Sequence, residues 1–220
     1  MNILAVDTSS KAASVALYKN DALAADCFYN HGKTHSVYIA PMIKEMLEAC
    51  DTSMSDIDYF ACGIGPGSFT GVRIGVTMVK TFAMVEEKQC IGVDSLYAAA
   101  LFHSLENVLT VAIEDARRNR VFACGVLNGK IVLDTQVFTL NELYNAVLEH
   151  NNKVLFVGGG ARVYGDDIKN NGFSANGDKL ITGSAIIKAA LIEIKKGNTL
   201  DCYSLMPKYL LKSQAEQNRE

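Results

Sequence analysis

The chain has 220 residues, 49% of them hydrophobic and 20% charged, a composition typical of a globular protein that buries a sizeable core. Its 21 Lys and Arg residues against 24 Asp and Glu residues give a net charge of −3, which excludes a protein that binds nucleic acid by positive charge alone. Residues 1–7 carry no basic segment and only a short apolar run, so we expect no signal peptide, no membrane-spanning helix and a cytoplasmic location.

The first half of the chain alternates apolar runs with turns and helical spacings. Short apolar runs between turns predict strands, and apolar residues at helical spacing predict helices. Asp94 or Ser95 is expected to cap the last helix of this half. We expect strands at 3–6, 13–18, 22–29, 59–64 and 89–93, and helices at 36–50, 69–87 and 96–103.

The second half repeats this order of elements. Thr139 and Glu142 have the spacing of a capping box, and Gly197 is expected to end the last helix. Three strands, a helix and a strand recur, which predicts a duplicated α/β domain with lobes at 1–106 and 107–220 and a cleft between them. We expect strands at 108–113, 121–127, 130–138 and 153–157, and helices at 139–150 and 184–196.

The segment GIGPGSFTGVRIG, residues 63–75, joins a predicted strand to a predicted helix. Backbone amides at such a junction are able to bind phosphate. A P-loop needs a lysine directly after its second glycine, but none follows Gly71 until Lys80. A dinucleotide pattern would need a third glycine where Ser68 or Thr70 stands. Both patterns are therefore excluded, and a general anion site remains an alternative.

The helix after this segment carries two apolar stripes, whereas a helix that covers a sheet needs only one. Gly71 and Gly75 lie one turn apart beside the second stripe, a spacing that allows close helix packing. The preceding helix has a second apolar patch as well. We expect these surfaces to dock a partner, with packing by a helix of the same domain as the alternative. The expected docking face comprises Tyr38, Met42, Gly71, Ile74, Gly75, Met78 and Phe82.

The turn after the first strand, Asp7, Thr8 and Ser9, is a candidate nucleotide or phosphate loop. An actin-like nucleotide-binding fold places a metal-binding carboxylate and a phosphate loop at this position. The turn lacks a glycine, however, which hinders close approach of a phosphate to the backbone. Hydrogen bonding within the loop is the favoured interpretation.

Two further groups are candidate binding sites. His31 and His35 have the spacing of a helical metal pair, but no third ligand is near in the sequence, so loop or cap hydrogen bonds are favoured. The basic run at 115–120 is short, which favours a solvated turn over an RNA contact. The six cysteines are scattered without a Cys-x-x-Cys pair and are expected to be reduced core residues.

Four segments together resemble the bacterial TsaB (YeaZ) family: residues 3–9, 34–36, 63–75 and 115–118. The resemblance implies an actin-like fold of two ribonuclease-H-like lobes with mixed sheets flanked by helices. It also implies a part in forming N6-threonylcarbamoyladenosine next to the anticodon of tRNAs that read codons beginning with A. In that system TsaD transfers the threonylcarbamoyl group, TsaE is an ATPase, and TsaB docks TsaD through the first two helices of each protein.

In TsaD, two histidines of a His-x-x-x-His motif hold the active-site metal, and the matching positions in this chain are Ser95 and Ala99. Neither side chain is a ligand for a transition metal. The resemblance therefore implies a non-catalytic scaffold without an intrinsic cofactor or metal, with ATP and tRNA bound at the level of the complex, and a homodimer when TsaD is missing. The alternatives are an ATP- or metal-dependent transferase, kinase or peptidase with its site in the interlobe cleft, and an RNA-binding module, which the net charge disfavours.

Overall fold

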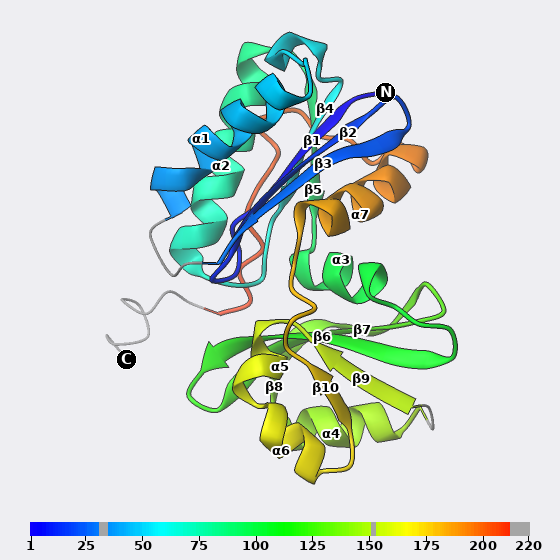
Figure 1. The fold of residues 1–220 in the computed structure, drawn as a ribbon. Helices are drawn as coiled ribbons and strands as arrows, with labels where there is room; N and C mark the ends of the chain where they lie inside the picture. The colour runs from blue at the N-terminus through cyan, green and yellow to red at the C-terminus, as the bar shows by residue number, and fades with distance from the viewer. Residues whose placement is uncertain (31–34, 151–152, 212–220) are drawn as a thin grey trace.

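The computed structural model describes residues 1–30, 35–150 and 153–211. Two five-stranded sheets lie one above the other in Figure 1, and helices α3 (Ser95–Phe102) and α7 (Gly183–Lys195) lie between them. Each sheet combines parallel and antiparallel strands and is flanked by helices. The expected α/β architecture of two duplicated lobes is therefore confirmed.

The first sheet has the strand order β3-β2-β1-β4-β5. Strands β1, β2 and β3 are antiparallel neighbours, and β4 and β5 continue the sheet parallel to β1. Every residue of β1 is buried because helices cover both faces: Leu4 and Val6 pack on the side of α1 and α2, and Ile3 and Ala5 on the side of α7. The bounds are β1 Ile3–Asp7, β2 Ala13–Lys19, β3 Ala22–Tyr29, β4 Tyr59–Gly63, β5 Gln89–Val93, α1 His35–Ala49, α2 Phe69–Val85 and a 3₁₀ turn Met54–Asp56.

The second sheet has the order β10-β9-β6-β7-β8, which repeats the pattern of the first. Thr139 and Glu142 form the expected capping box at the start of α4. Two short helices and a short strand between residues 159 and 176 were not expected from the sequence. The bounds are β6 Val108–Arg117, β7 Arg120–Leu127, β8 Lys130–Thr139, β9 Lys153–Val157, β10 Ser174–Asn176, α4 Leu140–Leu148, α5 Gly159–Val163 and α6 Gly165–Asn170.

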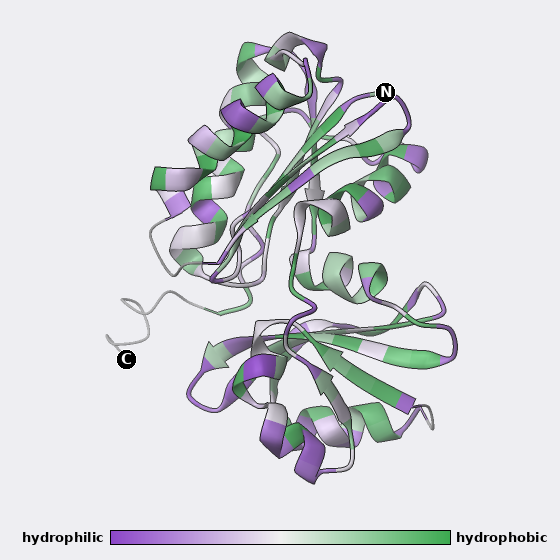
Figure 2. Ribbon diagram, in the orientation of Figure 1, coloured by the Kyte–Doolittle hydropathy of each residue, from purple (hydrophilic) through white to green (hydrophobic). Residues whose placement is uncertain are grey.

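Helices α3 and α7 join the two lobes through a shared hydrophobic core. Leu96 and Ala99 of α3 and Ala185 and Ile186 of α7 are fully buried, and residues from both sheets belong to the same cluster. Figure 2 shows hydrophobic residues on both sheets, and more hydrophilic residues on the outward-facing turns of the helices. None of the helices in the described part of the chain is long and apolar enough to cross a membrane.

The expected boundary of the second lobe, residues 107–220, needs correction at its C-terminal end. Helix α7 packs against β1, β2 and β5 of the first sheet and against α3. Beyond α7, Leu200 pairs with Cys90 at the edge of the first sheet, and Leu205 is fully buried in the first lobe. We call residues 198–211 the C-terminal strap. The helical pattern of residues 184–196 predicted the helix but carried no information about which sheet it covers.

Candidate functional site

The turn formed by Asp7, Thr8 and Ser9 lies beneath the glycine-rich segment. These three residues are at most 1% exposed. A Cβ atom at Gly63 would collide with the Asp7 carboxylate, and one at Gly71 would collide with the Thr8 carbonyl oxygen. The glycines therefore leave room for this turn, and they pack the first residues of α2 onto the end of β1.

Thr8 connects the turn to the backbone of α2. Its Oγ1 donates a hydrogen bond of 2.7 Å to the Gly71 carbonyl oxygen and accepts one of 3.0 Å from the Gly75 amide. The Ser68 side chain caps the helix by accepting from the Gly71 amide, and the Ser68 amide donates to the Ser9 carbonyl oxygen at 2.6 Å. Gly71 and Gly75 are buried in these contacts, so their predicted place on the docking face is wrong.

The Asp7 carboxylate is fully engaged inside the protein. Its Oδ1 accepts from the amide and hydroxyl of Ser9 at 3.0 and 2.8 Å, and its Oδ2 accepts from the Ser95 hydroxyl at 2.7 Å. Burial raises the pKa of Asp7, while the hydrogen bonds from Ser95 and Ser9 act in the opposite direction. A phosphate reaches this turn only if residues 67–71 move away, because they cover its backbone.

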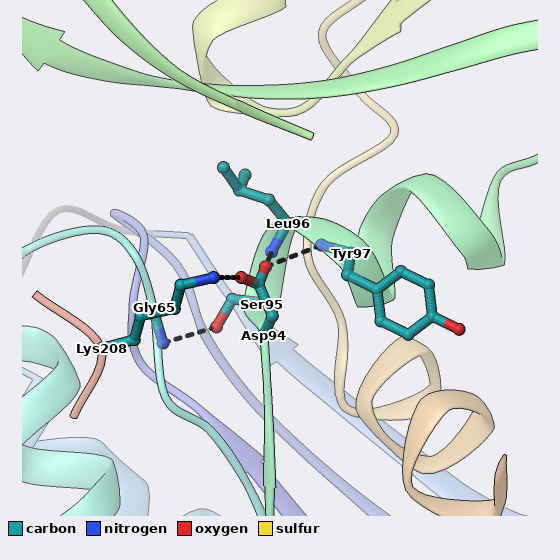
Figure 3. A network of polar contacts seen from close by, with 6 residues as sticks. All are labelled: Gly65, Asp94, Ser95, Leu96, Tyr97 and Lys208. Atoms are coloured by element: carbon teal, nitrogen blue, oxygen red, sulfur yellow. Dashed lines mark hydrogen bonds and ion pairs between the residues drawn. The ribbon is translucent and has the colours of Figure 1, made fainter. Parts of the chain in front are cut away.

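Helix α3 carries Ser95 and Ala99, the two positions that the resemblance matches to the metal-binding histidines of TsaD. The Ser95 hydroxyl accepts from the Gly65 amide at 3.1 Å (Figure 3), and Ala99 is fully buried. Asp94 caps the helix, as predicted, by accepting from the amides of Leu96 and Tyr97. Within residues 1–30, 35–150 and 153–211, no three His, Cys, Asp or Glu side chains come together as a metal site.

His35 and the candidate arginines lie on different elements of the fold. His31 lies outside the described residues. His35 Nε2 is 3.0 Å from the carbonyl oxygen of Ser10, and this contact is a loop hydrogen bond of the kind that was favoured over a metal site. Arg117 and Arg118 are exposed in the turn between β6 and β7, with positive φ angles of 63° and 53°. Neither makes an ion pair within the described part of the chain.

The second apolar stripe of α2 is open to solvent. Ile74, Met78 and Phe82 are half-buried and line a groove of about 620 Å³, whereas the first stripe is packed in the core as predicted. Met42 is only 4% exposed and belongs to the core, so its predicted place on the docking face is wrong. Tyr38 is half-buried near the start of α1. We call this surface the α2 groove; it is lined by Thr70, Arg73, Ile74, Thr77, Met78, Thr81 and Phe82.

One polar residue of the α2 groove was missed from the sequence. The Arg73 guanidinium lies 4.1 Å from the centre of the Phe69 ring, and its Nε donates to the Tyr209 hydroxyl at 2.8 Å. Tyr209 in turn stacks on Phe69 with ring centres 4.2 Å apart. The spacing of Phe69 and Arg73 on one helix face was readable, but the contact with Tyr209 joins residues 136 positions apart.

A second, smaller cleft of about 80 Å³ lies between the lobes. Glu114, at the end of β6, is only 9% exposed there and accepts a hydrogen bond of 2.9 Å from the Gly159 amide. Burial raises its pKa to about 7, and the nearby Asp7 and Asp115 carboxylates act in the same direction, against Lys11. The burial of Glu114 was not predicted from the sequence.

Comparisons with known proteins agree on one family. The chain matches the family model of TsaD, tRNA N6-adenosine threonylcarbamoyltransferase, over residues 30–190. It is 31% identical to the tRNA threonylcarbamoyladenosine biosynthesis protein TsaB of Bacillus subtilis, over 98% of this chain and 96% of that protein. The TsaB protein of Escherichia coli is 40% identical over 56% of this chain and 53% of its own length.

Solved structures show the same fold. YeaZ of Pseudomonas aeruginosa matches with a TM-score of 0.78 at 22% identity, covering 95% of this chain and 99% of that one. Component A of (R)-2-hydroxyglutaryl-CoA dehydratase from Acidaminococcus fermentans matches with a TM-score of 0.52 at 14% identity, covering 89% and 98%. The two mixed sheets and these matches identify an actin-like, ribonuclease-H-like fold. With the full-length match to the Bacillus subtilis protein, the chain belongs to the TsaB family of tRNA threonylcarbamoyladenosine biosynthesis proteins.

Proposed function

We propose that this chain is a non-catalytic scaffold that docks a TsaD transferase in the biosynthesis of N6-threonylcarbamoyladenosine next to the anticodon of tRNA. The observation that carries the proposal is the α2 groove, an apolar surface left open on a TsaB-family chain. Contiguous exposed apolar surface of this kind marks an interaction site. In the proposal, ATP, TsaE and tRNA are bound by the assembled complex in the cytoplasm, not by the isolated chain.

The chemistry of the buried residues supports a role without catalysis. Ser95 stabilises the Asp7 carboxylate, and Ala99 contributes only to the core. Burial raises the thiol pKa of Cys90 to about 11 and that of Cys124 to about 12, which leaves both cysteines protonated and poorly nucleophilic. An Asp7 that already accepts three hydrogen bonds has little capacity left to hold a metal or a proton for a reaction.

The match to the TsaD family model supports a TsaD protein as the partner of this surface. The match spans residues 30–190 and so includes both α1 and α2. A TsaD protein therefore has helices at the equivalent positions, and two such helix pairs can pack face to face about a pseudo-twofold axis. The same surface on a second copy of this chain accounts for a homodimer when TsaD is absent.

The test compares two aspartate variants on one helix. Met78→Asp introduces a charge into the α2 groove, and the matched control Met84→Asp changes a residue that is 52% exposed on the same helix but does not line the groove. Light scattering of mixtures with the host's TsaD should show a 1:1 complex for wild type and Met84→Asp, and at least 30-fold weaker association for Met78→Asp. A wild-type chain that forms no complex and instead binds ATP or a divalent metal stoichiometrically would support the enzyme alternative in the interlobe cleft.

A further inference from the structure

The C-terminal strap runs antiparallel to α2 along its length. Leu200 exchanges two backbone hydrogen bonds with Cys90, of 2.7 and 2.8 Å, just beyond the end of α2. Further along, Lys80 donates to the Tyr203 carbonyl oxygen at 3.2 Å, and Arg73 donates to the Tyr209 hydroxyl near the start of α2. Figure 1 shows this orange-to-red segment beside α2.

Several contacts fix the strap in this position. Leu205 is fully buried in the core beneath α1 and α2. The Lys208 amide donates to the Ile64 carbonyl oxygen at 2.8 Å, and its ammonium group lies 2.8 Å from the Asp94 carboxylate that caps α3 (Figure 3). The strap is thus an ordered part of the first lobe, and its surface has a defined place next to α2.

The outward side of the strap carries three large apolar side chains, along with the exposed polar residues Asp201 and Ser204. Tyr203 is 76% exposed, Met206 63% and Tyr209 42%, whereas Leu205 between them is buried. Large apolar side chains at this level of exposure, gathered on one short segment, are unusual for a surface that faces only water. Methionine and tyrosine are also the residue types that adapt best to a partner's surface.

Arg73 lies where the α2 groove meets the strap, and its positive charge favours a negatively charged group on the partner. Its guanidinium lies 4.1 Å from the centre of the Phe69 ring and 5.7 Å from the centre of the Tyr209 ring, and it makes no ion pair within the described residues. Only its Nε is used in the bond to Tyr209, so the two terminal nitrogens remain able to donate. A carboxylate on the partner is the group that best fits a guanidinium held in one plane.

We propose that the strap is a third element of the docking surface, so that the TsaD-type partner covers Tyr203, Met206 and Tyr209 together with the α2 groove and places a carboxylate against Arg73. The inference rests on the proposed docking function and extends it to a segment outside the first two helices. The strap is continuous with the groove through the Arg73 and Lys80 contacts, which is why one partner covers both.

The test places aspartate on the strap and at matched exposed positions elsewhere. Tyr203→Asp and Met206→Asp are compared with Leu148→Asp and Val163→Asp, apolar residues of the second lobe that are 60% and 53% exposed. Titration calorimetry with the host's TsaD should give at least tenfold weaker binding for each strap variant and less than a twofold change for the controls. Circular dichroism melts should be unchanged for all four variants, since none of these side chains is buried.

Met78→Asp in the same experiment separates this inference from the docking proposal. If Met78→Asp abolishes binding while both strap variants bind TsaD like wild type, the strap is not part of the surface and the docking proposal stands. If the strap variants weaken only self-association in sedimentation and leave TsaD binding intact, the strap contacts a second copy and the inference is overturned. If neither wild type nor any variant binds TsaD, the docking proposal itself fails.

Discussion

The replacement Gly75→Ala tests why the helix of the glycine-rich segment contains glycines. Helix propensity alone predicts that alanine stabilises the protein by about 1 kcal/mol at an interior helical position. The structure predicts the opposite, because the new Cβ would lie 2.6 Å from Thr8 Oγ1, with Cys62 and Val6 at ordinary contact distances of 3.5 and 3.6 Å. Thr8 is completely buried, so its side chain must either give up its hydrogen bonds by rotating or accept the close contact.

The size of the effect follows from the contacts of Thr8. If its side chain rotates away, the hydrogen bonds to Gly71 and from Gly75 are lost, at about 1 kcal/mol each. If it stays, overpacking costs about 1–3 kcal/mol. Set against the propensity gain of about 1 kcal/mol, the net loss in the free energy of unfolding is about 1 kcal/mol if Thr8 rotates and up to about 2 kcal/mol if it stays.

Urea unfolding followed by circular dichroism, arranged as a double-mutant cycle, measures this loss. In a Thr8→Ala background the obstacle to the new methyl group is gone, so Gly75→Ala should become neutral or stabilising. Gly165→Ala is the matched control, because a Cβ at Gly165 in α6 meets no atom within 4 Å. Equal stabilisation by Gly75→Ala and Gly165→Ala in the wild-type background would refute the close packing of α2 on Thr8.

Two predictions concern the buried polar groups. Ser95→Ala removes the donor to Asp7 and the acceptor of the Gly65 amide, so we expect the free energy of unfolding, measured in urea, to fall by about 1–3 kcal/mol. The control Ser104→Ala removes a more exposed hydroxyl and should cost less. Glu114 has a pKa raised from 4.5 to about 7 in the folded protein, so its contribution is fully present below pH 4.5 and is lost as pH rises to about 7. The stability of Glu114→Gln relative to wild type should therefore increase by about 3 kcal/mol between pH 4.5 and 8; a pH-independent difference would show that Glu114 is not desolvated.

The sequence predicted the larger elements well because their signals are local. The expected strand at 22–29 and the strand at 89–93 coincide with β3 and β5, and the long helices differ from α1 and α2 by one or two residues at their ends. Between residues 159 and 176 the elements are only three to six residues long, too short to show a period. The strap was missed because its irregular backbone is held by contacts with residues more than a hundred positions away.

The residues expected on the docking face include some that are buried and some that are partly exposed. A helical wheel placed Gly71 and Gly75 beside the exposed stripe, but it carries no information about the Asp7 turn that lies against them. A helical wheel also placed Met42 on a second apolar patch of α1, although α1 turns it into the core. Ile74, Met78 and Phe82 were assigned to the docking face because they form a second apolar stripe, which a helix that covers one sheet does not need. These three residues line the α2 groove.

The duplicated fold places equivalent carboxylates in the two lobes. Asp7 ends β1 and packs against Gly63, and Glu114 near the end of β6 packs against Gly159, so each acid faces a glycine that follows or ends the neighbouring parallel strand. In the first lobe, Ser95 and Ser9 satisfy the acid, and Ser9 is bonded in turn to Ser68, the N-cap of α2.

The polar network in the first lobe therefore sets the position of the helix whose outer face forms the α2 groove. A chain of contacts from Ser95 through Asp7 and Ser9 to Ser68 holds α2 in place, which gives these polar groups a structural role. In the second lobe Glu114 accepts a hydrogen bond from a single backbone donor and lies beside a cleft. Its carboxylate is therefore stabilised by fewer hydrogen bonds than that of Asp7 and is more responsive to pH.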